Sequence, residues 1–496
     1  MSASSTISGP AKAVSLPGHD GLYYGGAWHA PMTGLHKETH NPATGQVLGR
    51  AADGGTSDVN AAVEAARLGF QQWRNTLPLE RGLIMRRVAD VIRSHAAELA
   101  LLDSADCGNP VTEMSADVQV AAAGWEFFAG LVTEMKGDSI PMGPGAVNFP
   151  VREPRGVIAR IVAFNHPFMF SAFKSAAPLA AGNAVIIKPP EQAPLSTIRL
   201  AELLEGLLPP GVFNVLTGGR ELGAALTAHP GIAMVTLVGS VPTGRSVMKS
   251  ASDTLKPILL ELGGKNALIA YPDADPDEVA NAVVAGMNFG WCGQSCGSTS
   301  RAFLHDDIHD AVMDRLPDRL GAFKPGLPTD PRTTMGALTS QAQYERALHY
   351  IEVAKQDGAR LAFGGKRPQD PALARGYFVE PTVFTDVTQT MRIANEEVFG
   401  PILSVLRWND MTAMIDAVNN VEYGLTCSIW TNDLSVAHRT AAEVQAGFVW
   451  INEVGKHFLG APFGGYKQSG VGREECLSEL LAFTQEKNIH IRLRIR

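Results

Sequence analysis

Residues 293–297, Gly-Gln-Ser-Cys-Gly, place a cysteine among small neighbours in the middle of the chain. A carbonyl compound can approach the sulfur of Cys296 without meeting a large side chain. A thiol becomes a nucleophile when its pKa is lowered or when a nearby base takes its proton. An isolated cysteine is more often a buried, inert core residue, so a nucleophilic role for Cys296 needs supporting residues.

A glutamate stands ahead of that cysteine in residues 260–265, Leu-Glu-Leu-Gly-Gly-Lys. An acidic residue between apolar neighbours is either paired with a base in the core or poised as a general base with a raised pKa. Glu261 is therefore the candidate for taking a proton from the thiol or from water.

The elements that must position these residues follow from the alternation of short apolar strands with helices, which is typical of right-handed βαβ units and a buried parallel sheet. Strands are expected at 157–163, 184–188, 212–216 and 234–238, and helices at 168–181, 195–208, 221–228 and 242–250. A second α/β series has strands at 268–271, 301–304, 402–407, 426–431 and 447–451. Ahead of these we expect a hairpin at 23–50, helices from residue 57, at 81–102 and at 112–135, and a Pro/Gly-rich connector at 137–151. A final strand at 488–495 is expected to find its partner outside its own domain.

Polar residues follow two of these strands. Asn165 ends the first, and its neutral amide can stabilise a developing oxyanion without adding a charge. Lys174 lies on the next helix. It is either a further candidate site residue or an ordinary solvated or ion-paired lysine. Lys188 and Glu191 close the next strand at the same sheet edge, where ligands of open α/β sheets bind, and both can hydrogen-bond ribose hydroxyls.

The usual dinucleotide fingerprint, Gly-x-Gly-x-x-Gly after a strand, is absent. Gly239 and Ser240 leave a strand and open a helix instead, and the amides of that helix N-terminus can hold a pyrophosphate. Gly/Ser-rich βα turns are common, so this segment alone is also compatible with an ordinary turn.

Composition narrows the class of protein. The formal net charge of the 496 residues is −8, with no dense basic block, which argues against nucleic-acid binding. The five cysteines are irregularly spaced and lack nearby histidines, so we expect neither a disulfide framework nor a metal site. We find no signal peptide and no apolar run long enough for a membrane helix, and we expect a cytoplasmic protein.

Four segments together resemble the NAD(P)-dependent aldehyde dehydrogenase superfamily of the non-acylating type, over the range from Tyr23 to the C-terminus. They are Glu261-Leu-Gly-Gly-Lys, Gly293-Gln-Ser-Cys, Glu397-Val-Phe-Gly-Pro and Pro462-Phe-Gly-Gly. Each alone is modest evidence, but their order and separations are highly specific.

The resemblance implies roles for individual residues. Cys296 would attack the aldehyde, Asn165 and the Cys296 N–H would form an oxyanion hole supported by Lys174, and Glu261 would activate the hydrolytic water. The expected cofactor residues are Lys188 and Glu191 at the adenosine ribose, Gly239 and Ser240 at the pyrophosphate, Glu397 at the nicotinamide ribose, and Phe399, Phe164 and Leu262 along the nicotinamide half. Because the Glu191 carboxylate would repel a 2′-phosphate, NAD is expected over NADP.

The substrate is expected to be a small-molecule aldehyde that is bulky or aromatic. The resemblance places His166, Phe170, Phe173, Ser295, Gly297, His457 and Phe463 around the aldehyde. The chain departs from the family in having Ala163-Phe164-Asn165 where Pro-Trp-Asn is frequent, and His166 where Phe or Tyr commonly follows the asparagine. The two histidines and Lys456 could instead bind a carboxylate, which leaves a semialdehyde as the competing substrate.

The resemblance also implies an α/β architecture with a Rossmann-like parallel-sheet cofactor domain, a second α/β catalytic domain and a small β oligomerisation flap. The cofactor domain is expected to comprise residues 1–135 and 155–260, and the catalytic domain residues 261–455. The flap is expected at 136–154 and 480–496, and residues 456–479 are expected to form a tunnel-lining connection. A homodimer or homotetramer is expected. A CoA-acylating enzyme is the less favoured alternative because Glu261 is present, and a non-enzymatic role would predict loss of Cys296, Asn165 or Glu261.

Overall fold

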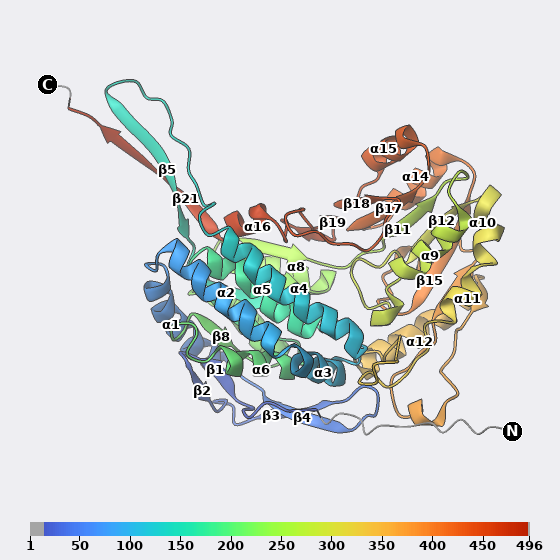
Figure 1. Cartoon of the computed structure of the whole chain (residues 1–496), viewed down its shortest axis with the longest axis horizontal. Coiled ribbons are helices and arrows are strands. Elements are labelled where there is room, and N and C mark those ends of the chain that lie inside the picture. Colours follow the sequence, from blue (N-terminus) through green and yellow to red (C-terminus); the bar gives the residue numbers. More distant parts are fainter. Residues whose placement is uncertain (1–13, 495–496) are drawn as a thin grey trace.

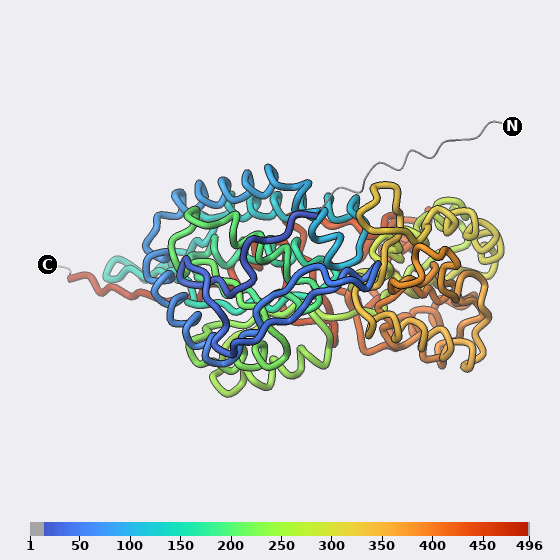
Figure 2. Tube along the Cα trace, turned by 90° about the horizontal axis from the view of Figure 1, so that it is seen from below, coloured from blue at the N-terminus to red at the C-terminus, as the bar shows by residue number. Residues whose placement is uncertain are grey.

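The computed structural model describes residues 14–494, so the first thirteen and the last two positions of the expected domains lie outside it. Two α/β bodies lie side by side, and a long two-stranded ribbon extends from the first of them (Figure 1). The same elongated arrangement is seen from below in Figure 2.

The first body is built on an eight-stranded sheet of order β2-β1-β8-β7-β6-β9-β10-β20. Its strands are β1 (Leu22–Tyr24), β2 (Ala27–His29), β6 (Val157–Ile161), β7 (Ala184–Lys188), β8 (Phe213–Val215), β9 (Met234–Val238), β10 (Ile258–Glu261) and β20 (Gly470–Val471). The five central strands from β8 to β10 are parallel. Their carboxyl ends therefore share one edge, which is where an open α/β sheet binds ligands.

Helices cover both faces of this sheet. One face packs against α1 (Thr56–Trp73), α7 (Arg220–Ala228) and α8 (Val241–Ser252). The other packs against α5 (Pro167–Ala180) and α6 (Leu195–Leu204), with α2 (Pro78–Ser94), α3 (Ala96–Cys107) and α4 (Val111–Gly130) lying outside them. The prediction of a single helix over residues 81–102 is wrong, because two helices cover this range. The backbone of His95 leaves the helical region (φ −109°, ψ 14°) and separates α2 from α3, while the apolar spacing continues across the break.

The second body holds a seven-stranded sheet of order β13-β14-β15-β12-β11-β17-β18. Its strands are β11 (Ala267–Ala270), β12 (Arg301–His305), β13 (Arg360–Phe363), β14 (Thr382–Thr385), β15 (Ile402–Trp408), β17 (Thr426–Trp430) and β18 (Phe448–Ile451). One face packs against α9 (Pro276–Gly286), α10 (Asp306–Met313) and α11 (Leu316–Leu320), and the other against α12 (Gln341–Gln356), α14 (Met411–Asn419) and α15 (Leu434–Glu443). All the strand pairs are parallel except the edge pair β13–β14.

The ribbon pairs β5 (Ala146–Pro154) with β21 (Thr484–Arg492) in antiparallel register over nine residues each. It projects away from both bodies (Figures 1 and 2). Reading 137–151 entirely as a connector was wrong, because Pro150 and Pro154 are tolerated in a two-stranded ribbon whose strands each have a free edge. The strand expected at 488–495 overlaps β21 over residues 488–492, where β5 is its partner, and residue 495 lies outside the described residues.

Smaller elements complete the chain. They are β3 (His36–His40) with β4 (Val47–Ala52), β16 (Tyr423–Gly424) with β19 (Tyr466–Lys467), α13 (Arg392–Asn395), α16 (Leu477–Ala482), and the 3-10 turns η1 (Phe289–Trp291) and η2 (Pro371–Leu373). No helix within residues 14–494 is long and apolar enough to cross a membrane. The domain limits expected from the sequence remain a proposal.

Candidate active site

The carboxyl edge of the first sheet collects the polar residues expected there. Asn165 follows β6, Lys188 ends β7, Gly239 follows β9 and Glu261 ends β10. Since β7, β6, β9 and β10 are neighbours in the sheet, these four positions lie along one edge. The side-chain oxygen of Asn165 has no hydrogen-bond partner within residues 14–494, whereas its backbone carbonyl accepts from Asn109 Nδ2 at 2.8 Å.

The second body supplies the cysteine loop that faces this edge. Gly293 has φ +68°, and a Cβ there would lie 2.2 Å from the Gly400 carbonyl oxygen, so only glycine fits. Asn266 donates from Nδ2 to the carbonyl oxygens of Cys296 at 2.6 Å and Ser298 at 3.0 Å. The loop is therefore fixed on both sides of the sulfur, and the Cys296 N–H has no backbone partner among the described residues.

Glu261 and Cys296 line the same two cavities, which therefore meet at this pair. Glu261 is 3% exposed, and neither carboxylate oxygen has a hydrogen-bond partner in the described part of the chain. Burial, reinforced by Glu474, raises the pKa of Glu261 to about 8, while the Cys296 thiol and Lys174 act in the opposite direction. The raised pKa makes the ionised carboxylate a stronger base, and this ionised form gains population as the pH rises toward 8.

The Cys296 thiol is not ionised in advance. Burial and the adjacent Glu261 carboxylate raise the pKa of Cys296 well above its ordinary value, and Lys174 only partly offsets this. The other cysteine of the loop, Cys292, is fully buried, and burial raises its pKa to about 12. Cys296 therefore needs a base beside it, and Glu261 is the carboxylate that meets it in both cavities.

The first cavity, which we call the sheet-edge cavity, has a volume of about 380 Å³ and runs from the turn after β9 to Cys296. Besides Glu261 and Cys296, six residues expected from the sequence line it: Phe164, Asn165, Gly239, Ser240, Glu397 and Phe399. The rings of Phe164 and Phe399 meet edge to face with centroids 5.7 Å apart. Sequence reasoning missed Gln343, Arg346 and Tyr423, which also line this cavity and come from distant segments without a motif.

Three of the expected cofactor residues lie outside this lining. Leu262 packs under α8, where a Cβ on Gly244 would come within 2.6 Å of its side chain. Lys188 Nζ donates to the Pro189 carbonyl oxygen at 3.2 Å, and burial lowers the pKa of Lys188 to about 8. Glu191 is half-exposed and pairs with Lys37 Nζ at 3.5 Å. Lys188 and Glu191 thus lie beyond the β7 end of the sheet-edge cavity.

The diglycine after Glu261 has a direct structural use. The N–H of Gly264 donates to Glu397 Oε1 at 2.9 Å. A Cβ on Gly263 would lie 2.1 Å from Glu397 Oε2, and one on Gly264 would lie 2.7 Å from the Cys296 carbonyl oxygen. Glycine at both positions therefore lets the Glu397 carboxylate and the cysteine loop approach the same turn.

The second cavity, which we call the aromatic cavity, has a volume of about 350 Å³. It is lined by all seven residues expected around the substrate: His166, Phe170, Phe173, Ser295, Gly297, His457 and Phe463. The sequence did not point to several others that line it, among them Asp117, Trp291, Trp450, Glu474 and Glu475. The adjacent acids Glu474 and Glu475 were the only available signal, whereas Asp117 and the tryptophans look like ordinary helix and loop residues.

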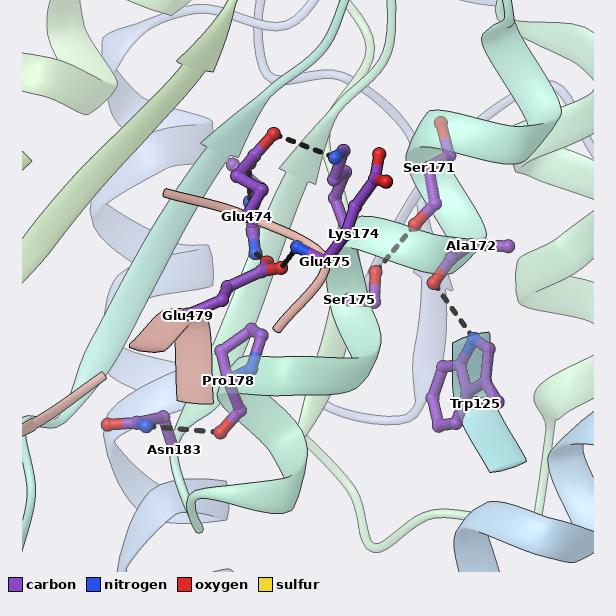
Figure 3. Close-up of polar contacts among 11 residues, drawn as sticks. Trp125, Ser171, Ala172, Lys174, Ser175, Pro178, Asn183, Glu474, Glu475 and Glu479 are labelled. Atoms are coloured by element: carbon purple, nitrogen blue, oxygen red, sulfur yellow. Dashed lines mark hydrogen bonds and ion pairs between the residues drawn. The ribbon is translucent and has the colours of Figure 1, made fainter. Parts of the chain in front are cut away.

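Lys174 belongs to a buried ionic network in the wall of the aromatic cavity. Its Nζ bonds Glu474 Oε2 at 2.7 Å, and Arg160 bonds Glu474 at 3.3 Å and Glu479 at 2.8 Å. Figure 3 shows Lys174 on α5 pointing toward Glu474, which belongs to the C-terminal segment of the chain. The surrounding carboxylates raise the pKa of Lys174 despite its burial, so it remains a cation near Glu261.

Three comparisons place this geometry among known proteins. The model of the aldehyde dehydrogenase family matches residues 28–489. Aldehyde dehydrogenase tropH of Talaromyces stipitatus is 54% identical over 488 residues, covering 97% of this chain and 94% of that protein. Betaine aldehyde dehydrogenase of Mesorhizobium japonicum is 42% identical over 452 residues, covering 91% and 92%. The solved structure of a mutant P. syringae AldA indole-3-acetaldehyde dehydrogenase, in complex with NAD+ and IAA, superposes with a TM-score of 0.94 at 34% identity, covering 97% and 98%.

Proposed function

The chain belongs to the aldehyde dehydrogenase family, and we propose that it oxidises a bulky, aromatic aldehyde to the carboxylic acid with NAD and water. The observation that carries this proposal is the junction of the two cavities at Glu261 and Cys296. An aldehyde in the aromatic cavity and a cofactor in the sheet-edge cavity would meet at the sulfur. The Glu261 carboxylate lines the same junction, within reach of a water molecule.

The residues of the sheet-edge cavity fit NAD. Ser240 is the N-cap of the twelve-residue helix α8, whose first amides suit a pyrophosphate. Gln343 Oε1 and Asn165 Oδ1 are buried without a partner among the described residues, as polar groups awaiting a ligand would be. Gly239 and Ser240 would hold the pyrophosphate, and Glu397 the nicotinamide ribose. Phe164, Phe399 and Leu262 would lie along the nicotinamide half, and Lys188 and Glu191 at the adenosine ribose.

The first step is attack by Cys296 on the aldehyde carbon. Because its thiol has a raised pKa, the proton passes to the Glu261 carboxylate as the carbon–sulfur bond forms. The side-chain amide of Asn165 and the N–H of Cys296 would stabilise the oxyanion of the thiohemiacetal. When bound, NAD supplies the acceptor for the hydride that converts the thiohemiacetal to a thioester.

The second step is hydrolysis of the thioester on Cys296. Glu261 first releases to solvent the proton that it took from the thiol. It then takes a proton from water, the resulting hydroxide adds to the thioester carbon, and the thiolate leaves and is reprotonated. Lys174 and Glu474 act on Glu261 through space, since the cation lowers and the carboxylate raises its pKa. A CoA-acylating enzyme would have no use for a base at this position, so hydrolysis is the favoured fate.

A neutral aromatic substrate is favoured over a semialdehyde by the pairing of charges. His166 bonds Asp117 at 2.7 Å, His457 bonds Glu475 at 3.0 Å, and Lys456 bonds Glu453 at 2.7 Å. Neither histidine nor the lysine is thus left to attract a substrate carboxylate. Asp117, Glu474 and Glu475 are each paired with a basic side chain in this way, which also disfavours a cationic aldehyde.

This substrate assignment is tested with benzaldehyde, succinic semialdehyde and betaine aldehyde. We expect kcat/KM for benzaldehyde to exceed the other two values by at least about 100-fold, because each charged substrate would be buried against an aromatic wall without a free partner. The measurement is NADH formation at 340 nm. A preference for either charged aldehyde would contradict the assignment, whereas oxidation of none of the three would contradict the proposed activity.

Cofactor preference is tested at Glu191. We expect the protein to prefer NAD, and Glu191→Gln to raise kcat/KM for NADP by about tenfold, because one negative charge no longer opposes the 2′-phosphate. Glu221→Gln, an exposed change on α7, serves as the matched control. The dissociation constants of NAD and NADP, measured by calorimetry, should follow the change in the corresponding kcat/KM values. A native preference for NADP would overturn this account of Glu191.

Quaternary structure and compartment follow the same line of inference. The β5–β21 ribbon stands clear of both bodies (Figure 1) and would add a strand to the sheet of a second copy. We propose a homodimer or a homotetramer on this basis. The five free cysteines fit a reducing compartment such as the cytoplasm.

A further inference from the structure

A hydrogen-bonded polar pair interrupts the wall of the aromatic cavity. His166 Nδ1 lies 2.7 Å from Asp117 Oδ2, and the two side chains are only 14% and 6% exposed. The imidazole packs against Phe170 at 5.2 Å and Trp291 at 5.5 Å between ring centroids. A carboxylate and an imidazole are costly to bury in such surroundings.

Local structure does not account for this pair. His166 occupies the N-cap position of α5, yet its side chain makes no capping hydrogen bond. Asp117 lies inside α4, six residues after Val111, where an apolar side chain would serve packing better. The resemblance drawn from the sequence places Phe or Tyr where this chain has His166. The pair therefore points to recognition of something inside the cavity.

The hydrogen bond to Asp117 fixes how the imidazole is presented. A carboxylate only accepts, so Nδ1 carries the proton and donates to Asp117 Oδ2. Nε2 is then the remaining polar atom of the ring. It has no hydrogen-bond partner within residues 14–494 and is not sealed from solvent. His166 and Asp117 both line the cavity, so a group on the substrate can use this nitrogen.

We propose that the His166–Asp117 pair recognises a hydroxyl group on the aromatic ring of the aldehyde substrate. This inference rests on the proposed oxidation of an aromatic aldehyde. A neutral imidazole accepts the hydroxyl hydrogen at Nε2, and a protonated one donates to the hydroxyl oxygen, so a hydroxyl satisfies the ring in either state. An ether can only accept and a methyl group does neither, and both would leave Nε2 without a partner when the ring is neutral.

The test compares hydroxybenzaldehydes with methylbenzaldehydes of the same substitution pattern. For at least one of the 2-, 3- and 4-isomers, we expect kcat/KM for the hydroxyl compound to exceed that for its methyl counterpart by tenfold or more. His166→Phe should reduce this ratio to about one, chiefly through KM. Asp117→Asn should lower the ratio less, because asparagine still accepts from Nδ1. His457→Phe is the matched control, since it alters the other histidine of the cavity and should leave the ratio unchanged.

Two further measurements keep the outcomes distinct. Calorimetric binding of the corresponding hydroxybenzoate to the enzyme without cofactor should weaken in His166→Phe, which excludes an effect on the chemical step. Thermal unfolding and NAD binding should match the unmutated protein, which excludes misfolding. If benzaldehyde is oxidised but no isomer pair shows the preference, or His166→Phe retains it, the inference is wrong while the proposed function stands. If no aromatic aldehyde is oxidised, the proposed function itself is wrong.

Discussion

Replacing Cys296 with alanine should lower aldehyde oxidation by at least about 10⁴-fold, because no thiohemiacetal or thioester can form without the sulfur. Binding of NAD should be retained, since the loop is held by Asn266 and Gly293 rather than by the cysteine side chain. The measurements are the rate of NADH formation and the dissociation constant of NAD from calorimetry or fluorescence.

Cys292→Ala is the matched control for this prediction. Cys292 lies in the same loop but is fully buried with a pKa raised to about 12, so its removal should leave most of the activity. Substantial oxidation by the Cys296→Ala protein would exclude the proposed nucleophile. If Cys292→Ala folded normally but lost activity, the nucleophile would have to be reassigned from Cys296 to Cys292.

Glu261→Gln should slow steady-state turnover by about 10²–10³-fold while still allowing a burst of NADH that is faster than this turnover. The amide cannot take a proton from water, so the thioester would persist after the oxidative step. Stopped-flow absorbance should show a burst approaching one NADH per active site, followed by the slow phase. Thiol attack also benefits from the carboxylate, so we expect the burst itself to be slower than in the unmutated protein.

The pH dependence follows from the raised pKa of Glu261. Only the ionised carboxylate acts as a base, and its pKa of about 8 means that this form gains population as the pH rises through 8. The hydrolytic rate of the unmutated protein should therefore rise over about pH 7–9, and the Glu261→Gln rate should lose this rise. Normal turnover in Glu261→Gln, or an unchanged pH profile, would require a different base.

The sequence predicted the carboxyl edge of the first sheet well because buried parallel strands leave a strong local pattern. Asn165, Lys188 and Gly239 could be placed at strand ends on that basis, whereas β10, which carries Glu261, was not predicted. The meeting of Glu261 with Cys296 could be inferred only from the order of the motifs. It depends on packing between two bodies, which no local periodicity records.

The errors have equally specific causes. The break at His95 leaves the apolar spacing of the helices intact, so the pattern did not reveal it. Strand β5 contains two prolines, which a sheet interior excludes but a ribbon with free edges accepts. Asp117 and Trp291 reach the aromatic cavity from α4 and the η1 turn, and their role appears only when α4, α5 and the cysteine loop are packed together.

The most direct test of the account is to trap the covalent intermediate. Glu261→Gln protein mixed with NAD and benzaldehyde is quenched in acid during the slow phase, digested and analysed by mass spectrometry. The account predicts a benzoyl thioester on the peptide that contains Cys296, with the acyl group assigned to that sulfur and absent when NAD is omitted. An acyl group on Cys292 or on another residue, or a burst of NADH without any acylated peptide, would contradict the central claim.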